Sequence, residues 1–133
     1  MSIEKSLYSL VTNNSAISAL IGGRFYPQHA AQAVTDSYCT YNVISIVSTP
    51  EYTTENDVKQ ARVQVDCFGS DSGDSYSKSV AISEAIQNLY GTKSTVLSTN
   101  FLLITTDDQT DIFSKETGRN YRSIDLLIHY KEI

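Results

Sequence analysis

The sequence is short of the residues from which most small metal and catalytic sites are built. Its 133 residues include no tryptophan, one methionine, two prolines, two cysteines and two histidines. The cysteines, Cys39 and Cys67, have no CxxC partner, and His29 and His129 have no HxxxH spacing, so a structural zinc site is excluded. A disulfide between adjacent strands is possible, but in a reducing compartment two small buried thiols are expected.

Positive charge and long apolar runs are scarce as well. Ten lysines and arginines stand among fifteen aspartates and glutamates, which gives a net charge of −5. Tight binding of nucleic acid needs a Lys/Arg surface that neutralises phosphates, so a nucleic-acid-binding surface is not expected here. No apolar stretch could span a bilayer, and Met1–Leu10 contains Glu4 and Lys5 in place of the apolar segment of a secretory signal. We therefore expect a protein made in the cytoplasm, with no membrane partner.

Three segments have the periodicity of helices, at about residues 3–12, 15–21 and 74–90. The second is expected to begin at Asn14 or Ser15 and to end at the glycines 22–23. In the third, one stripe contains Ile82, Ala85, Ile86 and Leu89. Tyr76 and Val80 fall off this stripe, which indicates either a widened core face or a second contact surface for a neighbour.

Four longer segments are typical of strands, and a brief extended segment covers residues 24–27. The strands are expected at residues 38–49, 60–68, 101–106 (with pairing out to Phe113) and 120–131. Residues 60–68 alternate, with Ala61, Val63, Val65 and Cys67 on one face. The order predicts an α+β fold, in which a mainly antiparallel sheet of about four strands has helices packed on one face. The length predicts a single domain over residues 1–133.

The residues offer little for catalysis. Asp107, Asp108 and Asp111 are the only acidic cluster near a strand end, and without a DxD spacing or a neighbouring histidine they indicate solvated carboxylates more than a metal site. The turn at residues 69–73 precedes a helix but lacks the lysine of a P-loop and the glycine spacing of a dinucleotide site. We expect no catalytic residue, no metal and no cofactor.

Three segments stand out as an ordered set. Residues 21–27 read IGGRFYP, residues 61–69 read ARVQVDCFG, and residues 111–126 read DIFSKETGRNYRSIDL. Together they resemble the tail completion proteins of long-tailed bacteriophages, whose pattern runs G-R-[IV]-Y-P, then R-V-Q-[IV]-D-x-[FW], then D-x-[YF]-x-x-E-T and Y-R-x-[SI]-x-D. The resemblance covers nearly the whole chain. The family often has a proline before its first long strand and tryptophan near the ends of two strands, and this chain has neither.

The resemblance implies a structural virion protein at the junction of head and tail. It implies a ring, as a homohexamer, that terminates the tail tube, contacts the tail tube protein and the head–tail connector protein, and lets DNA pass through its lumen. An acidic ring suits this role because it repels the DNA backbone, whereas a basic lumen would hold it.

Candidate contact residues follow from that role. The polar segment 51–59 has almost nothing that could enter a core, so it is expected to be an inter-subunit arm ordered against a neighbour. The candidate residues of the arm are Thr53, Thr54, Glu55, Asn56, Asp57 and Val58. Tyr76 and Val80 are the candidates for a second interface. The candidate acids of the lumen are Asp71, Asp74, Asp107, Asp108 and Glu116.

Two other functions compete with this one. The first is an interaction module of the same fold that acts as a monomeric assembly or regulatory factor. The second is an enzyme that uses Asp107, Asp108 and Asp111 with His129, which no nucleophile-elbow or metal motif supports.

Overall fold

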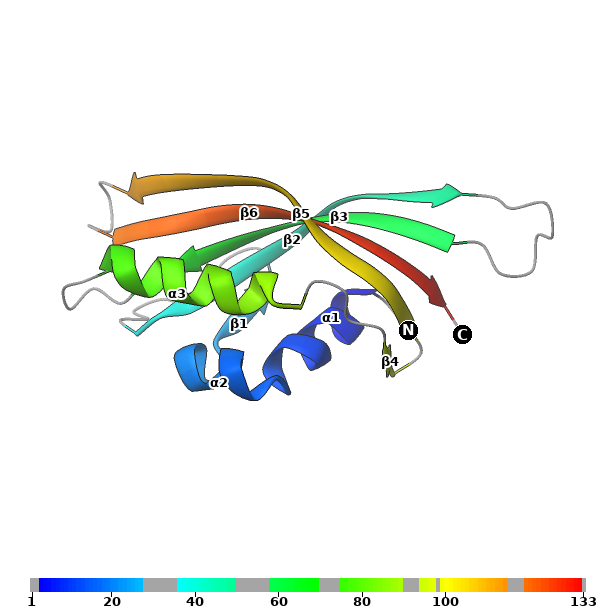
Figure 1. The fold of residues 1–133 in the computed structure, drawn as a ribbon, viewed down its shortest axis with the longest axis horizontal. Coiled ribbons are helices and arrows are strands. Elements are labelled where there is room, and N and C mark those ends of the chain that lie inside the picture. Colours follow the sequence, from blue (N-terminus) through cyan, green and yellow to red (C-terminus); the bar gives the residue numbers. More distant parts are fainter. Residues whose placement is uncertain are drawn as a thin grey trace.

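The fold is one six-stranded sheet with three helices on a single face (Figure 1). A computed structural model describes residues 3–27, 36–49, 58–69, 75–89, 94–97, 99–114 and 119–132. The helices are α1 (Ile3–Thr12), α2 (Ser15–Ile21) and α3 (Ser75–Gln87). The strands are β1 (Phe25–Pro27), β2 (Tyr38–Thr49), β3 (Val58–Phe68), β4 (Ser94–Val96), β5 (Thr99–Ser114) and β6 (Arg119–Glu132). The predicted α+β class, with helices on one face of a mainly antiparallel sheet, is confirmed.

Capping residues set both ends of α2. Asn14 caps α2, because its side-chain Oδ1 accepts hydrogen bonds from the N–H groups of Ala16 (3.0 Å) and Ile17 (3.1 Å). Gly22 follows α2 with a φ of 58°, a left-handed conformation that glycine adopts without strain. The third helix, α3, covers Ser75–Gln87 and is shorter than the predicted residues 74–90.

The sheet order is β1-β2-β3-β6-β5-β4. All neighbouring strands are antiparallel except β1, which runs parallel to β2 over Cys39–Tyr41. The four long strands are the four that the sequence predicts. Strand β5 extends over Thr99–Ser114, beyond the strand predicted at residues 101–106. Its pairing with β6 includes Phe113, the residue to which pairing was expected to extend. The short edge strand β4 was not predicted, since its sequence is a polar connection.

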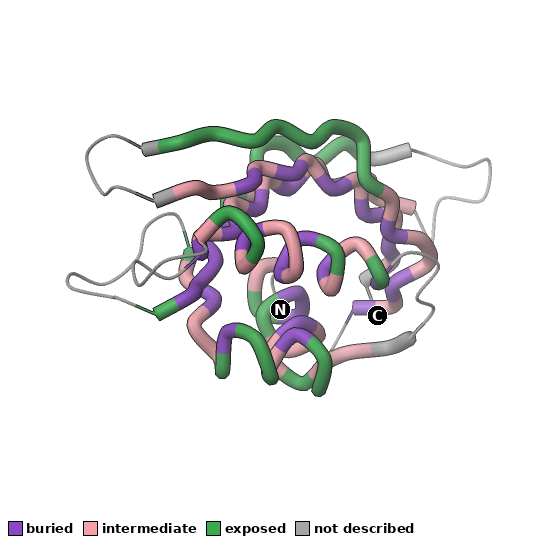
Figure 2. Tube along the Cα trace, turned by 60° about the vertical axis from the view of Figure 1, so that its left-hand side comes forward, coloured by how far each residue is buried: buried purple, intermediate pink, exposed green. Residues whose placement is uncertain are grey.

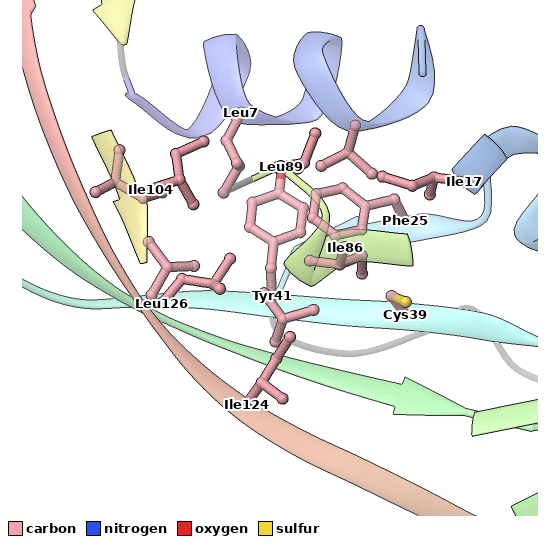
Figure 3. Close-up of a cluster of buried hydrophobic side chains, with 14 of the residues drawn as sticks. Leu7, Ile17, Phe25, Cys39, Tyr41, Ile86, Leu89, Ile104, Ile124 and Leu126 are labelled. Carbon is pink, nitrogen blue, oxygen red and sulfur yellow. The ribbon is translucent and has the colours of Figure 1, made fainter. Parts of the chain in front are cut away.

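The core lies between the sheet and the helices (Figure 3). Alternate residues of β3 and β6 point into it and are fully buried, namely Ala61, Val63, Val65, Cys67, Ile124, Leu126 and Ile128. Ile82 and Ile86 of α3 are 1% and 0% exposed, Leu89 is buried after the helix, and Ala85 packs against the same cluster. The predicted stripe of α3 is therefore confirmed.

Cys39 and Cys67 lie directly opposite each other on β2 and β3. Both are free and fully buried, as the sequence predicts. Burial raises the pKa of the Cys39 thiol well above its ordinary value, and a hydrogen bond with Cys67 adds to this. Both cysteines therefore act as small core residues.

None of the three helices in the described residues lies on the other face of the sheet (Figure 1). Its residues on β3 and β6 alternate with the core residues and are half-buried. Of the helices in the described residues, none has the length and apolar character needed to cross a membrane.

Candidate functional site

The predicted contact residues fall partly outside the described residues. Those outside are Thr53, Thr54, Glu55, Asn56, Asp57, Asp71, Asp74 and Glu116. Val58 is described and is the first residue of β3, where it pairs with Thr49 of β2. The predicted arm therefore joins the ends of a long hairpin, and its last residue belongs to the sheet.

The β2–β3 hairpin carries exposed apolar residues close to this arm. It projects past the helices at one end of the sheet (Figure 1). Ile44, Ile46 and Val47 of β2 are 49%, 47% and 59% exposed. Sequence reasoning found the strand but missed the exposure, because β-branched residues in a strand usually indicate a core face. A register shift between Val43 and Ser45 accommodates Ile44 as an extra residue and begins the uncovered part of the strand.

A second exposed stretch lies at the opposite edge of the sheet. Residues Thr106–Phe113 of β5 are all exposed, and Figure 2 shows an unbroken exposed stretch along this strand. Ile112 and Phe113 are its large apolar residues, at 38% and 55% exposed. A register shift between Thr106 and Asp108 marks its beginning.

Asp107 and Asp108 differ in their partners. The carboxylate of Asp107 accepts a hydrogen bond from Arg62 Nη1 at 2.8 Å, and Asp125 lies 3.4 Å from the same nitrogen. The hydrogen bond to Asp107 is the main cause of a raised pKa at Arg62. Asp108 Oδ1 accepts from the N–H of Gln109 at 2.8 Å, and its side chain is exposed. Of the two lumen candidates that the structure describes, Asp107 forms an ion pair with Arg62, and the contacts described here give Asp108 none.

Arg122 and Asp111 join β6 to β5 beneath the exposed edge. Arg122 is 9% exposed, and its Nε and Nη2 donate to the two carboxylate oxygens of Asp111 at 2.7 and 3.2 Å. Its Nη1 donates to Ser83 Oγ at 3.3 Å, which ties the pair to α3. The hydrogen bond from Arg122 holds the pKa of Asp111 below its ordinary value.

Tyr76 and Val80, the candidates for a second interface, have different environments. Tyr76 is 49% exposed, and its hydroxyl donates to Asp111 Oδ2 at 3.5 Å. Val80 is half-buried on α3. Tyr76 therefore borders the exposed edge of β5, and its position is the more suitable of the two for contact with a neighbour.

Among the described residues, His129 and Asp111 of the enzymatic alternative lie far apart. His129 pairs with Leu103, whereas Asp111 pairs with Arg122, seven positions away along β6. At about 3.3 Å per residue this separates the histidine from Asp111 by about 23 Å. Within the described ranges, no three His, Cys, Asp or Glu side chains come together in a way that could hold a metal ion.

Aromatic rings form a row across one end of the open face. Tyr38 stacks on Phe68 with ring centroids 4.7 Å apart, and Phe68 stacks on Tyr121 at 4.5 Å. Tyr26 of β1 continues the row, 6.1 Å from Tyr38. Cross-strand aromatic pairs of this kind each contribute about 0.2–1 kcal/mol. The row therefore stabilises the face that no helix covers.

The sequence matches the family model described as "Tail completion protein gp17" over residues 5–126. The chain belongs to this tail completion protein family. No curated protein matches it. Among solved structures, it is similar to a chain in the virion of a native gene transfer agent particle, with a TM-score of 0.72 and 10% sequence identity over 98% of this chain and 95% of that one. At this identity the likeness establishes a shared fold, while the family establishes a structural component of a phage tail.

Proposed function

We propose that this tail completion protein forms a ring, as a homohexamer, that ends the tail tube and joins the tail to the head connector. The observation that supports this most is the family match, which spans residues 5–126 and so includes nearly the whole fold. In this role the protein is made in the host cytoplasm, catalyses no reaction and needs no cofactor. Its partners are its own copies, the tail tube protein and the head–tail connector protein.

Exposed apolar residues support the assembly part of the proposal. A chain that worked alone would be expected to blunt its strand ends with charge or to cover them. Here Ile44, Ile46 and Val47 lie exposed on a hairpin that projects from the body. We propose that this hairpin, together with the arm residues 53–58 at its end, contacts the neighbouring subunit in the ring, with Tyr76 and Val80 as a second contact.

The charge supports passage of DNA through the lumen. Each subunit has a net charge of −5, so a ring of copies repels phosphates and DNA can slide without being held. Asp71, Asp74, Asp107, Asp108 and Glu116 are the acids proposed to line the lumen. Asp108 is the first to test, because Asp107 already forms an ion pair with Arg62.

Electron microscopy of particles that lack this protein tests the role. Full heads beside separate tails of normal or excess length are expected, because nothing would end the tube or join it to the head. Particles in which heads and tails remain joined would contradict the proposal. Full complementation by a variant that stays monomeric inside the particle would favour the assembly-factor alternative.

Deletion of Thr53–Asp57 tests the arm separately. The deleted residues include no plausible core side chain, so thermal unfolding of the purified subunit should be nearly unchanged. Joined particles should nevertheless be lost. A deletion variant that completes tails as well as the parent would show the segment to be an ordinary surface loop.

A further inference from the structure

Both outer edges of the sheet lack a strand partner over part of their length. Strand β1 pairs only with Cys39–Tyr41 of β2, so the outer edge of Val43–Thr49 has no neighbouring strand among the described residues. Strand β4 pairs only with Thr99–Phe101 of β5, so the outer edge of Leu103–Ser114 also has no neighbouring strand among the described residues. Such edges present unpaired backbone N–H and C=O groups and are templates for an added strand.

Each free edge carries a pair of adjacent exposed apolar residues. On β2 these are Ile46 and Val47, and on β5 they are Ile112 and Phe113. The pairs also match in the faces they occupy. Ile46 lies opposite the core residue Ala61, and Phe113 lies opposite Asn120, which hydrogen-bonds to Ser75 of α3, so both belong to the helix-covered face.

Val47 and Ile112 both belong to the open face. Val47 lies opposite Gln60, and Ile112 lies opposite Tyr121, whose ring stacks on Phe68 on that face. Since side chains alternate along a strand, one register brings both matched pairs together.

We propose that the free edge of β5 in one copy pairs with the free edge of β2 in the next copy, with Phe113 opposite Ile46 and Ile112 opposite Val47. The sheet then continues from subunit to subunit. Within one sheet β5 runs antiparallel to β2, because three antiparallel pairings separate them. A head-to-tail contact preserves that direction, so the new pairing is antiparallel. This inference rests on the proposed ring and names the contact that closes it.

The distribution of charge favours pairing of β5 with β2 of a second copy over pairing of β5 with β5. Strand β5 has three acids on its exposed stretch, Asp107, Asp108 and Asp111, whereas Val43–Thr49 has no charged residue. Pairing β5 with another β5 would place carboxylates close to carboxylates, which is destabilising. Pairing β5 with β2 avoids this. Because the contact uses two different patches, repeating it generates a ring or a filament and not a closed dimer.

The two short strands allow this register. With Phe113 opposite Ile46, β5 ends at Ser114 opposite Ser45, before it would reach the part of β2 that β1 occupies. At the other end, β4 of the incoming copy pairs with residues 99–101, which lie beyond the last residue of β2, Thr49. Neither short strand obstructs the contact.

A hollow marks the place where the free edge of β2 begins. It is lined by Glu4, Pro27, Tyr41, Asn42 and Val43, at the end of β1. Strand β1 stops there, so the edge of β2 is accessible from this point onward.

Disulfide trapping with Val47→Cys and Ile112→Cys tests the contact. Opposed residues in an antiparallel pair have Cα atoms about 4.5–5.5 Å apart, within the range that a disulfide spans. The native cysteines are fully buried and should not compete. The variants are made singly and together and used to complement a phage that lacks the gene, and the particles are dissociated without reductant.

The double variant should give a ladder of linked subunits that ends at the size of the ring. A mixture of the two single variants should give linked dimers, and each single variant alone should give none. Leu20→Cys paired with Ile112→Cys is the matched control, because Leu20 is 38% exposed but lies on α2, and it should give no ladder.

Two results would overturn the inference. Dimers from Val47→Cys alone would show a two-fold contact between β2 edges. Particles that contain the double variant, with heads and tails joined, but no linked subunits would leave the tail role standing and remove this contact. Joined particles in the complete absence of the protein would instead remove the proposed function.

A variant without thiol chemistry covers the case in which the cysteine variants give no particles. Val47→Asp should fold with an unchanged melting temperature but should lower the yield of infectious particles roughly tenfold or more, because it opposes Ile112 beside Asp111. Val47→Thr keeps the β-branched shape and should keep the yield. A normal yield with Val47→Asp would refute the pairing.

Discussion

The two halves of β2 have similar residues but opposite environments. In the first half, Cys39 and Tyr41 are buried at 0% and 6% exposed, whereas in the second half Ile46 and Val47 are 47% and 59% exposed. Strand β5 is divided in the same order, with Phe101 buried near its start and Thr106–Phe113 exposed. In both strands a register shift lies near the boundary. Apolar character alone therefore does not separate a core strand from a contact strand, since the position of the helices decides.

The part of the sheet that the helices cover and the part that they leave uncovered should differ most in the loss of stability when one isoleucine in each is truncated. Ile86→Ala removes a side chain that is fully buried between α3 and the sheet and should lower the free energy of unfolding by about 2–5 kcal/mol. Ile46→Ala is the matched control, and because its side chain is half exposed it should cost well under about 1 kcal/mol in the isolated subunit. Chemical denaturation of both variants measures the difference. Equal losses would mean that the projecting half of β2 is covered in the free subunit.

The sequence predicted the covered part better than the uncovered part, for a physical reason. Periodicity reports which residues can share a face, and in α3 the stripe of Ile82 and Ile86 faces the core as expected. Periodicity does not report how far the helices reach along the sheet. The pairing of β5 out to Phe113 was therefore expected but its exposure was not, and Ile46 was assigned to a strand without any sign that it would be uncovered.

The candidate site was predicted only in part for a related reason. Asp107 was expected to be a solvated acid, but its partner, Arg62, lies 45 positions earlier in the chain and reaches it only through the pairing of β3, β6 and β5. The partnership of Arg122 with Asp111 depends likewise on the register of the last hairpin. Asp111 and Arg122 both lie in the segment that resembles the family motif, but the contact between them is set by the pairing of β5 with β6.

A smaller effect is expected from the ion pair that holds the exposed edge to the covered part. Arg122→Gln should lower the free energy of unfolding by about 1 kcal/mol at neutral pH, because it removes hydrogen bonds to a carboxylate that is partly open to solvent. Arg62→Gln is the control, since that arginine lies at an exposed pair and should cost less.

The pH dependence gives this prediction a second measurement. The pKa of Asp111 is lower in the folded than in the unfolded chain, so its contribution is fully present above the unfolded pKa of about 3.9 and is lost as the pH falls through the lower folded pKa. The difference in stability between the parent and Arg122→Gln should therefore shrink on acidification below about pH 4. A difference that stays constant down to pH 2 would show that Arg122 acts through packing alone.

The smallest effect on the fold, and the most direct comparison of the two faces of the sheet, comes from reversing one charge on each. Asp108 lies on the open side, opposite Asp125, and Glu84 is exposed on α3 in the helix layer. Replacing either by lysine should leave thermal unfolding nearly unchanged, because neither side chain is buried. If the open face lines the lumen, Asp108→Lys adds about 12 positive charge units to the lumen of a six-subunit ring, where the DNA passes.

DNA release should then slow at low salt and recover as salt rises, because phosphate contacts weaken steeply with salt. Glu84→Lys changes the total charge equally and should leave release unaffected. Slower release with Glu84→Lys alone would place the helix layer, and not the open face, against the DNA, while unchanged release with both would mean that the acidic charge serves solubility.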